Sequence, residues 1–489
     1  MHNALHHQYT YYVGCKTQLN NKIFRRILYM YNYAGVFSVW SIMARTVPAQ
    51  HQMFSSVPGI LIVLLSLLPM SAWSGYEDSS QAMSVSDAPY LTAEAAIILA
   101  YARSPALSQA FAQVKKGEAQ KDEAKSAYYP QVSLSSSYGQ HGEYVYGPKL
   151  KQLIYDFGKT AGAIDNQTHL TESYHSDLMR TITEVTGDTL LAYSSVKRYQ
   201  ETIQITKKMI ASLEGVKETA ELRLAAGLSS SSDALQAATR IAALNTVLEQ
   251  YRSQLNNAKV NLAQLTGKNV ETLAELPSAL SQELTQDPNR IDYGSVPSVR
   301  SAVAQVKAAE ALLGSTKAQH MPSISFDASR LHQYQRNYNN SNPAWENQIG
   351  VSVDIPLYQG GAISARVSQA YEALEASKAS VNQARLEAEQ RTTTALSNWR
   401  GADSRVLTSL YQMDIANRTR DIYQEEYKLG DRSLNDLLSV EQDVFQALSS
   451  NVAARFDRYD AVINFAVAQN TLLPLLGVDS PSEQALPEL

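Results

Sequence analysis

Few side chains of this 489-residue chain have the types and spacing that catalysis or metal binding requires. The nine histidines are not spaced like metal ligands, and His169 and His175, six residues apart, would lie on different faces of a helix. The sequence contains no nucleophile motif, no phosphate-binding loop and no pair of carboxylates at a strand end. We therefore expect no enzymatic activity, no cofactor and no metal site.

The composition narrows the possible functions further. The net charge is −5 and 18% of the residues are charged, so nothing indicates a nucleic-acid partner. The single cysteine, Cys15, lies upstream of the predicted mature protein. We therefore expect a mature chain without disulfides, thiolate metal sites or a lipid-anchored N-terminal cysteine.

An export signal is predicted ahead of the folded region. The apolar run Ile60–Met70 is followed by small residues that suit cleavage before Gly75. The run is too short to cross a bilayer as a helix, which takes about 20 residues. We assign 43–74 to a cleavable signal peptide region, with a short buried helix as the alternative, and 1–42 to a disordered or non-native extension.

The element that organises the chain is a long helix between Gly158 and Gly227. This stretch has no proline, and its apolar or small residues recur in alternating steps of four and three, as in a coiled-coil helix. At about 1.5 Å per residue, the helix would be about 100 Å long. The seam residues are Leu178, Ile182, Val185, Thr189, Ala192, Val196, Tyr199, Ile203, Thr206, Ile210 and Leu213.

The same layout occurs twice, which predicts a tandem internal repeat. The matched segments are Ser104–Lys115 with Val296–Lys307, "YDFG" at Tyr155–Gly158 with "YQGG" at Tyr358–Gly361, and Gly227 with Gly430. Proline ends a helix before each pair of strands, and glycine opens each long helix after it. The helix-to-strand junctions are Pro130 and Pro322, and the strand-to-helix junctions are Gly158, Gly360 and Gly361.

Each half also predicts a strand hairpin with one apolar face. Val132 and Leu134 alternate with serines, and Val351 and Val353 alternate with polar residues. About ten residues of alternation suit a membrane-spanning strand, although a sheet packed on a core gives the same pattern. The export signal favours the membrane. The second strand is predicted at Leu150–Phe157, after a turn-rich stretch that ends with Gly147 and Pro148.

Four strands cannot close into a barrel, and lipid does not tolerate open sheet edges. The chain should therefore oligomerise into a barrel of eight, twelve or sixteen strands, and twelve is the smallest closure that leaves a pore. The predicted fold class is an α+β membrane protein in which a long coiled-coil α-helical barrel joins a transmembrane β-barrel.

With these features, residues 91–477 resemble the TolC family of outer-membrane channel-tunnels. The resemblance depends on the repeat, the junctions, "YQGG" and "YKLGDRSLNDLL" at Tyr427–Leu438. It implies a homotrimer with a twelve-stranded barrel in the outer membrane of a Gram-negative cell and a helical tunnel across the periplasm. It also implies docking to an inner-membrane ABC or RND transporter through a periplasmic adaptor (a membrane fusion protein).

The resemblance also divides the chain into regions. The first repeat is 91–267, with strands at about 130–157 and a long helix at about 159–226. The second repeat is 298–477, with strands at about 322–357 and a long helix at about 361–429. An equatorial connector, 268–297, lies between them, and the tail is 478–489.

The family's functional residues lie at the periplasmic tip, in the turns at Gly227 and Gly430. There an arginine and a tyrosine of one helical hairpin bind the other hairpin and keep the entrance closed. By motif match these are Arg432 and Tyr427, and the receiving groups are Asp233 and Ser232.

Asp436 would belong to an acidic ring at the same entrance. We expect this ring to be thin, because Ser439 stands where relatives often carry a second aspartate, with Glu441 nearby. A structural alternative is that Asp233, Asp431 and Ser433 only cap the helices that start beside them.

The predicted function is a passive export duct that draws energy from its inner-membrane partner. "YDFGK" at Tyr155–Lys159 resembles members that serve type I protein secretion, and the missing anchor cysteine argues against the lipoprotein efflux branch. The alternative is a small-molecule efflux duct of a tripartite pump. A rival of another class is a periplasmic coiled-coil scaffold that has no pore.

Overall fold

The computed structural model describes residues 90–138, 143–269, 272–284, 291–335 and 344–478. The predicted extension 1–42, the signal region 43–74 and residues 479–489 of the tail lie outside these ranges. All of the described residues belong to one compact unit of the chain, which begins at Ser84.

Two long helices form the frame of this unit. Helix α6 spans Lys159–Ala225 and α9 spans Ala362–Leu429, each following a glycine with positive φ, 91° at Gly158 and 84° at Gly361. Glycine adopts this left-handed conformation without the steric penalty that a Cβ atom brings. Most of the predicted seam is buried on α6, the exceptions Val185 and Tyr199 being partly exposed.

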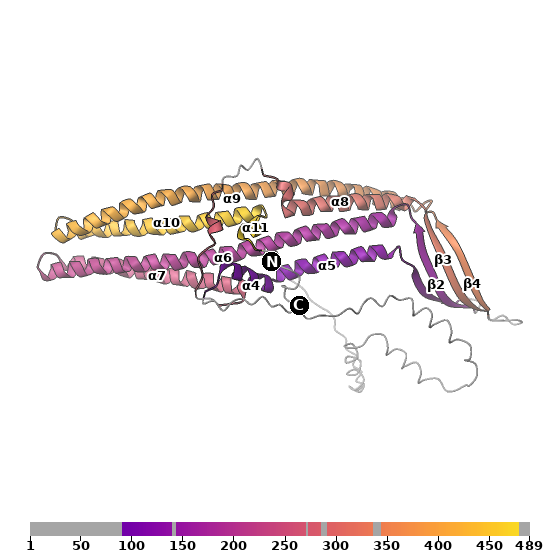
Figure 1. Cartoon of the computed structure of the whole chain (residues 1–489), viewed down its shortest axis with the longest axis horizontal. Helices are drawn as coiled ribbons and strands as arrows, with labels where there is room; N and C mark the ends of the chain where they lie inside the picture. Colours follow the sequence, from indigo (N-terminus) through magenta and orange to yellow (C-terminus); the bar gives the residue numbers. More distant parts are fainter. Residues whose placement is uncertain (1–89, 139–142, 270–271, 285–290, 336–343, 479–489) are drawn as a thin grey trace, which may run out of the picture. The chain divides into compact units, whose positions relative to one another are not determined.

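Shorter helices pack along the two long ones (Figure 1). In the first half, α5 (Pro105–Ser126) and α7 (Ser231–Thr266) both pack against α6. In the second half, α8 (Pro297–Lys317) and α10 (Leu434–Ala468) both pack against α9. The halves join where α8 and α10 also contact α6. Each half therefore has one long helix flanked by two shorter ones.

Four of the remaining helical elements lie around the middle of α6: α4 (Ala93–Arg103), α11 (Leu472–Leu476) and the 3-10 turns Ser278–Ser281 and Tyr293–Ser295. The 3-10 turn Ala318–His320 instead follows α8 directly before β3, beside the start of α6. The Tyr193 hydroxyl of α6 lies 2.9 Å from the carbonyl oxygen of Leu91 and 2.6 Å from that of Ala274. The described part of the connector is thus fastened to α6 and to the segment before α4.

The four strands form one antiparallel sheet in the order β1-β2-β3-β4. They are β1 (Gln131–Tyr138), β2 (Glu143–Tyr155), β3 (Ser323–Gln335) and β4 (Ala344–Asp354). Among the described residues, β1 and β4 are the outer strands of this sheet and each has one partner.

The start of β2 corrects the prediction of a turn at Gly147 and Pro148. The strand begins at Glu143 and passes through both residues, with Pro148 opposite Leu134 of β1. On the other side, pairing with β3 is interrupted between Tyr146 and Lys149. Proline has no N–H to donate to a neighbouring strand, so it is rare inside a sheet. Here the strand can contain Pro148 because its pairing with β3 stops at that point.

No helix in the described ranges is both long enough and apolar enough to cross a membrane.

Candidate functional site

The first candidate site is the apolar face of the sheet. The strand registers place Val132, Leu150, Ala328 and Ile349 directly opposite one another across all four strands. Directly opposed residues lie on the same face of an antiparallel sheet, so every strand contributes apolar residues to one face. Its exposed members include Val132, Leu134, Ile349, Val351 and Val353.

The opposite face of the sheet is polar. The row next to the apolar one contains Gln131, Lys151 and Asp327, paired in register. The Ser352 hydroxyl of β4 donates a hydrogen bond to the Asp327 carboxylate on this face. A sheet that is apolar on one side and charged on the other suits lipid outside and water inside.

Aromatic residues gather at the two ends of the apolar face. At the end far from the helices, Tyr138 and Tyr144 lie 4.6 Å apart between ring centres, and His332 lies 4.9 Å from Trp345. At the near end, the rings of Tyr155 and Phe157 are 4.7 Å apart. Aromatic rings at both edges of an apolar band are typical of membrane–water interfaces.

The second candidate site is the pair of helical turns at the other end of the long helices. Gly227 and Gly430 close them with φ of 72° and 91°. The caps are serines, because Ser230 accepts from the N–H of Ser232 and Ser433 accepts from the N–H of Asp436. The capping alternative therefore applies to Ser433 and not to Asp233 or Asp431.

Tyr427 is buried, only 3% of its surface remaining exposed. Its hydroxyl has no hydrogen-bond partner among the described residues. Burial raises the pKa of this hydroxyl, the negative charge of nearby Asp233 raises it further, and Arg223 opposes the shift. The predicted hydrogen bond from Tyr427 to Asp233 is absent within the described chain, and one between chains stays a prediction.

Arg432 has a different partner from the predicted one. Its Nε donates to Glu426 at 2.9 Å, and its guanidinium carbon lies 4.2 Å from the centre of the Tyr423 ring. These contacts stay within the hairpin of α9 and α10. The predicted Arg432 contact with Asp233 or Ser232 is absent from the described chain, and a contact between chains stays a prediction.

Arg223, near the end of α6, is a tip residue that the motif match did not single out. Its Nη1 donates to the carbonyl oxygens of Tyr427 at 2.8 Å and Lys428 at 3.0 Å. The sequence signal would have been a basic residue in the last turn of a long helix. That pattern ordinarily indicates an interaction with the residue's own helix dipole, so it does not reveal the neighbouring helix.

Glu441 does not contribute to an exposed acidic ring at the entrance. Its side chain is buried between α10 and α6, with 1% of the residue exposed, and one carboxylate oxygen accepts from the Ser212 hydroxyl at 3.0 Å. The other oxygen has no partner among the described residues. Asp436 and Ser439 are both exposed, and of the two only Asp436 carries a charge. The acidic ring, if three chains form it, would therefore consist of Asp436 without Glu441.

Replacing Glu441 by glutamine should stabilise the protein at pH 8. Burial raises the pKa of the Glu441 carboxyl, so the folded chain binds this proton more tightly than the unfolded chain does. Stability from this group therefore falls as the pH rises through the folded pKa. The gain should be about 1 kcal/mol at pH 8 and should disappear near pH 4. Thermal unfolding of the variant and the wild type at both pH values measures this gain in stability.

The control for this prediction is Glu425→Gln. Glu425 is exposed and pairs with Lys428 one turn away on the same helix. An equal gain at pH 4 and pH 8 for Glu441→Gln would contradict the argument from burial.

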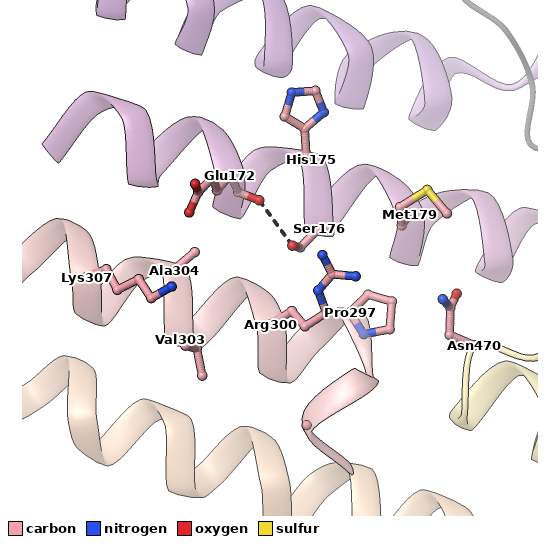
Figure 2. Close-up of a pocket in the computed structure, with 11 residues that line it drawn as sticks. Glu172, His175, Ser176, Met179, Pro297, Arg300, Val303, Ala304, Lys307 and Asn470 are labelled. Carbon is pink, nitrogen blue, oxygen red and sulfur yellow. Dashed lines mark hydrogen bonds between the residues drawn. The ribbon is translucent and has the colours of Figure 1, made fainter. Parts of the chain in front are cut away.

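A further cavity of about 440 Å³ lies between α6 and α8, lined by Glu172, Arg300 and Lys307 among others. Figure 2 shows Arg300 extending from α8 toward α6, while His175 points away from α8. The Glu172 carboxylate lies 2.9 Å from the His169 ring, and this contact lowers its pKa. Within the described ranges, no three His, Cys, Asp or Glu side chains are grouped to hold a metal ion.

Comparison with known proteins agrees with this geometry. The model of the outer membrane efflux protein family matches residues 96–268 and 294–471. Outer membrane efflux protein BepC of Brucella suis is 26% identical over 75% of this chain and 82% of its own length. Protein CyaE of Bordetella pertussis is 25% identical over 73% of this chain and 79% of its own length.

Solved structures share the fold. The outer membrane protein VceC of Vibrio cholerae superposes with a TM-score of 0.65 at 17% identity, covering 77% of this chain and 96% of that one. The resemblance to TolC-like channels and the fold of long helices with four strands are therefore confirmed. The chain belongs to the outer membrane efflux protein family, and it is a channel rather than an enzyme.

Proposed function

We propose that three copies of this chain close a twelve-stranded barrel in the outer membrane, four strands from each. The single observation that carries the proposal is the apolar face that continues in register across all four strands. In lipid such a sheet needs partners for both outer strands, and β1 of one copy pairing with β4 of the next supplies them.

The helices would continue the barrel as a tunnel through the periplasm. Helix α5 packs against α6 and α8 against α9, with α6 against α8 in the middle. This order leaves α5 and α9 at the two sides of the protomer, matching the two outer strands. The proposal includes the two repeats, 91–267 and 298–477, the connector 268–297 between them, and export by the signal region 43–74.

The proposed partners are a periplasmic adaptor and an inner-membrane ABC or RND transporter. A channel of this kind performs no chemistry, so the energy for export must come from the transporter. The tip turns at Gly227 and Gly430 are the parts of the chain farthest along the helices from the sheet, which suits them to meet a partner from the inner membrane.

For the cargo we favour type I protein secretion, on the resemblance of "YDFGK" at Tyr155–Lys159. Asp156 of this motif accepts from the N–H of Thr160 at 2.7 Å and so caps the start of α6. Small-molecule efflux is the second candidate, favoured by the name of the relative BepC, an outer membrane efflux protein.

Reconstitution separates the two cargo classes. The chain would be expressed in an outer-membrane-channel-deficient Gram-negative host, once with an ABC transporter, its adaptor and a protein substrate, and once with an RND pump and its adaptor. Secreted protein in the medium without restored drug resistance supports type I secretion. Restored resistance without secretion overturns that preference in favour of efflux.

An epitope inserted after Asn339 should be detected on intact cells. Asn339 lies outside the described residues, in the sequence between the end of β3 at Gln335 and the start of β4 at Ala344. Those two strand ends lie at the end of the sheet away from the helices. The duct orientation places that end outside the cell. Antibody labelling before and after outer-membrane permeabilisation measures it, and labelling only after permeabilisation would reverse the orientation. A periplasmic scaffold would also give that second result.

A further inference from the structure

Arg223 joins the two helical hairpins of one chain. It lies on α6, in the first hairpin, and its Nη1 donates to the carbonyl oxygens of Tyr427 and Lys428 on α9, in the second. Arg432 by contrast pairs with Glu426 inside the second hairpin. Among the described residues 220–235 and 423–436, Arg223 is the one side chain whose hydrogen bonds cross between the hairpins.

The acceptors are the carbonyls at the C-terminus of α9. Carbonyls at a helix C-terminus carry the negative end of its dipole, which favours a cation. The Tyr427 carbonyl also accepts from the N–H of Gly430 at 3.2 Å, so it binds Arg223 as a second donor. The carbonyls at the end of α6 do not need the Arg223 side chain as a donor. The Leu222 carbonyl accepts from the N–H of Ala226, and the Arg223 carbonyl accepts from the N–H of Leu228. The Arg223 guanidinium therefore donates its hydrogen bonds to the neighbouring helix α9.

The same guanidinium covers the ring of Tyr427. Its central carbon lies 5.1 Å from the ring centre, within the range of a cation–π contact. A Cβ atom at Gly430 would approach Nη2 of Arg223 to 3.4 Å, so the glycine turn and the arginine fit closely. Tyr427 is thus held from the side of α6 as well as by its own helix.

We infer that Arg223 is a positioning residue for closure of the periplasmic entrance, fixing the α9 tip and Tyr427 against the end of α6. This inference rests on the proposed duct. Opening requires the two hairpins to separate at the tip, and separation breaks both hydrogen bonds and the ring contact in each chain. Closure in this scheme needs no direct contact between Arg432 and Asp233.

The test compares Arg223→Gln, Arg223→Lys and the control Lys217→Gln in the full-length trimer. Lys217 lies on the same helix and pairs with Glu221 of that helix at 3.4 Å. Two measurements are made: resting conductance in planar bilayers, and hydrogen–deuterium exchange of peptides covering 425–434. Heat-resistant trimer on a gel confirms that each variant has assembled.

Arg223→Gln should raise the resting conductance and the exchange rate of 425–434 about tenfold, since it removes hydrogen bonds from a charged donor. Arg223→Lys, which still donates to carbonyls, should restore most of the closure, and Lys217→Gln should behave as the wild type. Unchanged exchange in Arg223→Gln, or an equal increase in Lys217→Gln, would overturn the inference. A wild-type protein that conducts no ions even when its adaptor is added would instead overturn the proposed duct.

Discussion

Arginine in place of Val353 is expected to lower the amount of protein that assembles in the outer membrane. Val353 lies on the apolar face of β4, opposite Ile324 of β3, and 57% of its surface is exposed in the single chain. Val353 lies in the same cross-strand row as Tyr155, at the aromatic edge near the helices, where a lipid-facing arginine costs about 0–1 kcal/mol. A trimer would carry that cost three times. Heat-resistant trimer in outer-membrane fractions, measured against wild type, gives the effect.

The matched control is arginine at Ser352, the preceding residue. Ser352 lies on the polar face beside Asp327, so an arginine there would meet a carboxylate in place of lipid. Its trimer yield should stay near that of wild type. Equal losses for the two variants would show that the two faces of the sheet do not differ in environment, which contradicts the barrel.

The long elements could be predicted from the sequence because their signals are repeated many times. The seam of α6 extends over several heptads, and glycines mark both of its ends, so the predicted 159–226 differs from the observed Lys159–Ala225 by one residue. The predicted start of β2 was wrong because its signal is short and occurs once. The Gly147-Pro148 pair is a stronger turn signal than the few alternating residues before it. Only the pairing with the neighbouring strands shows that β2 begins earlier, at Glu143.

The tip shows what a motif match cannot supply. The match names Asp233 and Ser232 as the partners of Arg432, but within the chain its partner is Glu426, six residues earlier in the last turn of α9. Arg223 contacts residues about 200 positions later, and Glu441 contacts Ser212 across a similar separation. Such contacts follow from the packing of one hairpin on the other, and no local pattern encodes them.

The gate hypothesis predicts that Arg432→Ser and Tyr427→Phe, combined, raise the resting conductance without lowering trimer stability. In this proposal the two side chains reach Asp233 and Ser232 across the entrance of the assembled trimer. Asp233 is available for this role, because Ser230 caps α7 in its place. At a solvated tip each ion pair is worth about 0–1 kcal/mol, and three copies add up to a closure that a partner can still open.

The single variants distinguish this gate from contacts within one chain. Within the chain, the Tyr427 hydroxyl is buried without a partner among the described residues, so its removal should cost nothing and Tyr427→Phe alone should leave the conductance unchanged. A gate that uses the hydroxyl predicts that Tyr427→Phe raises the resting conductance by itself, and that Asp233→Ala does the same. The measurement is single-channel recording of each purified variant at rest. If the double variant conducts no more than the wild type, the closure does not depend on Arg432 and Tyr427, and these residues belong to the ordinary packing of the α9–α10 turn.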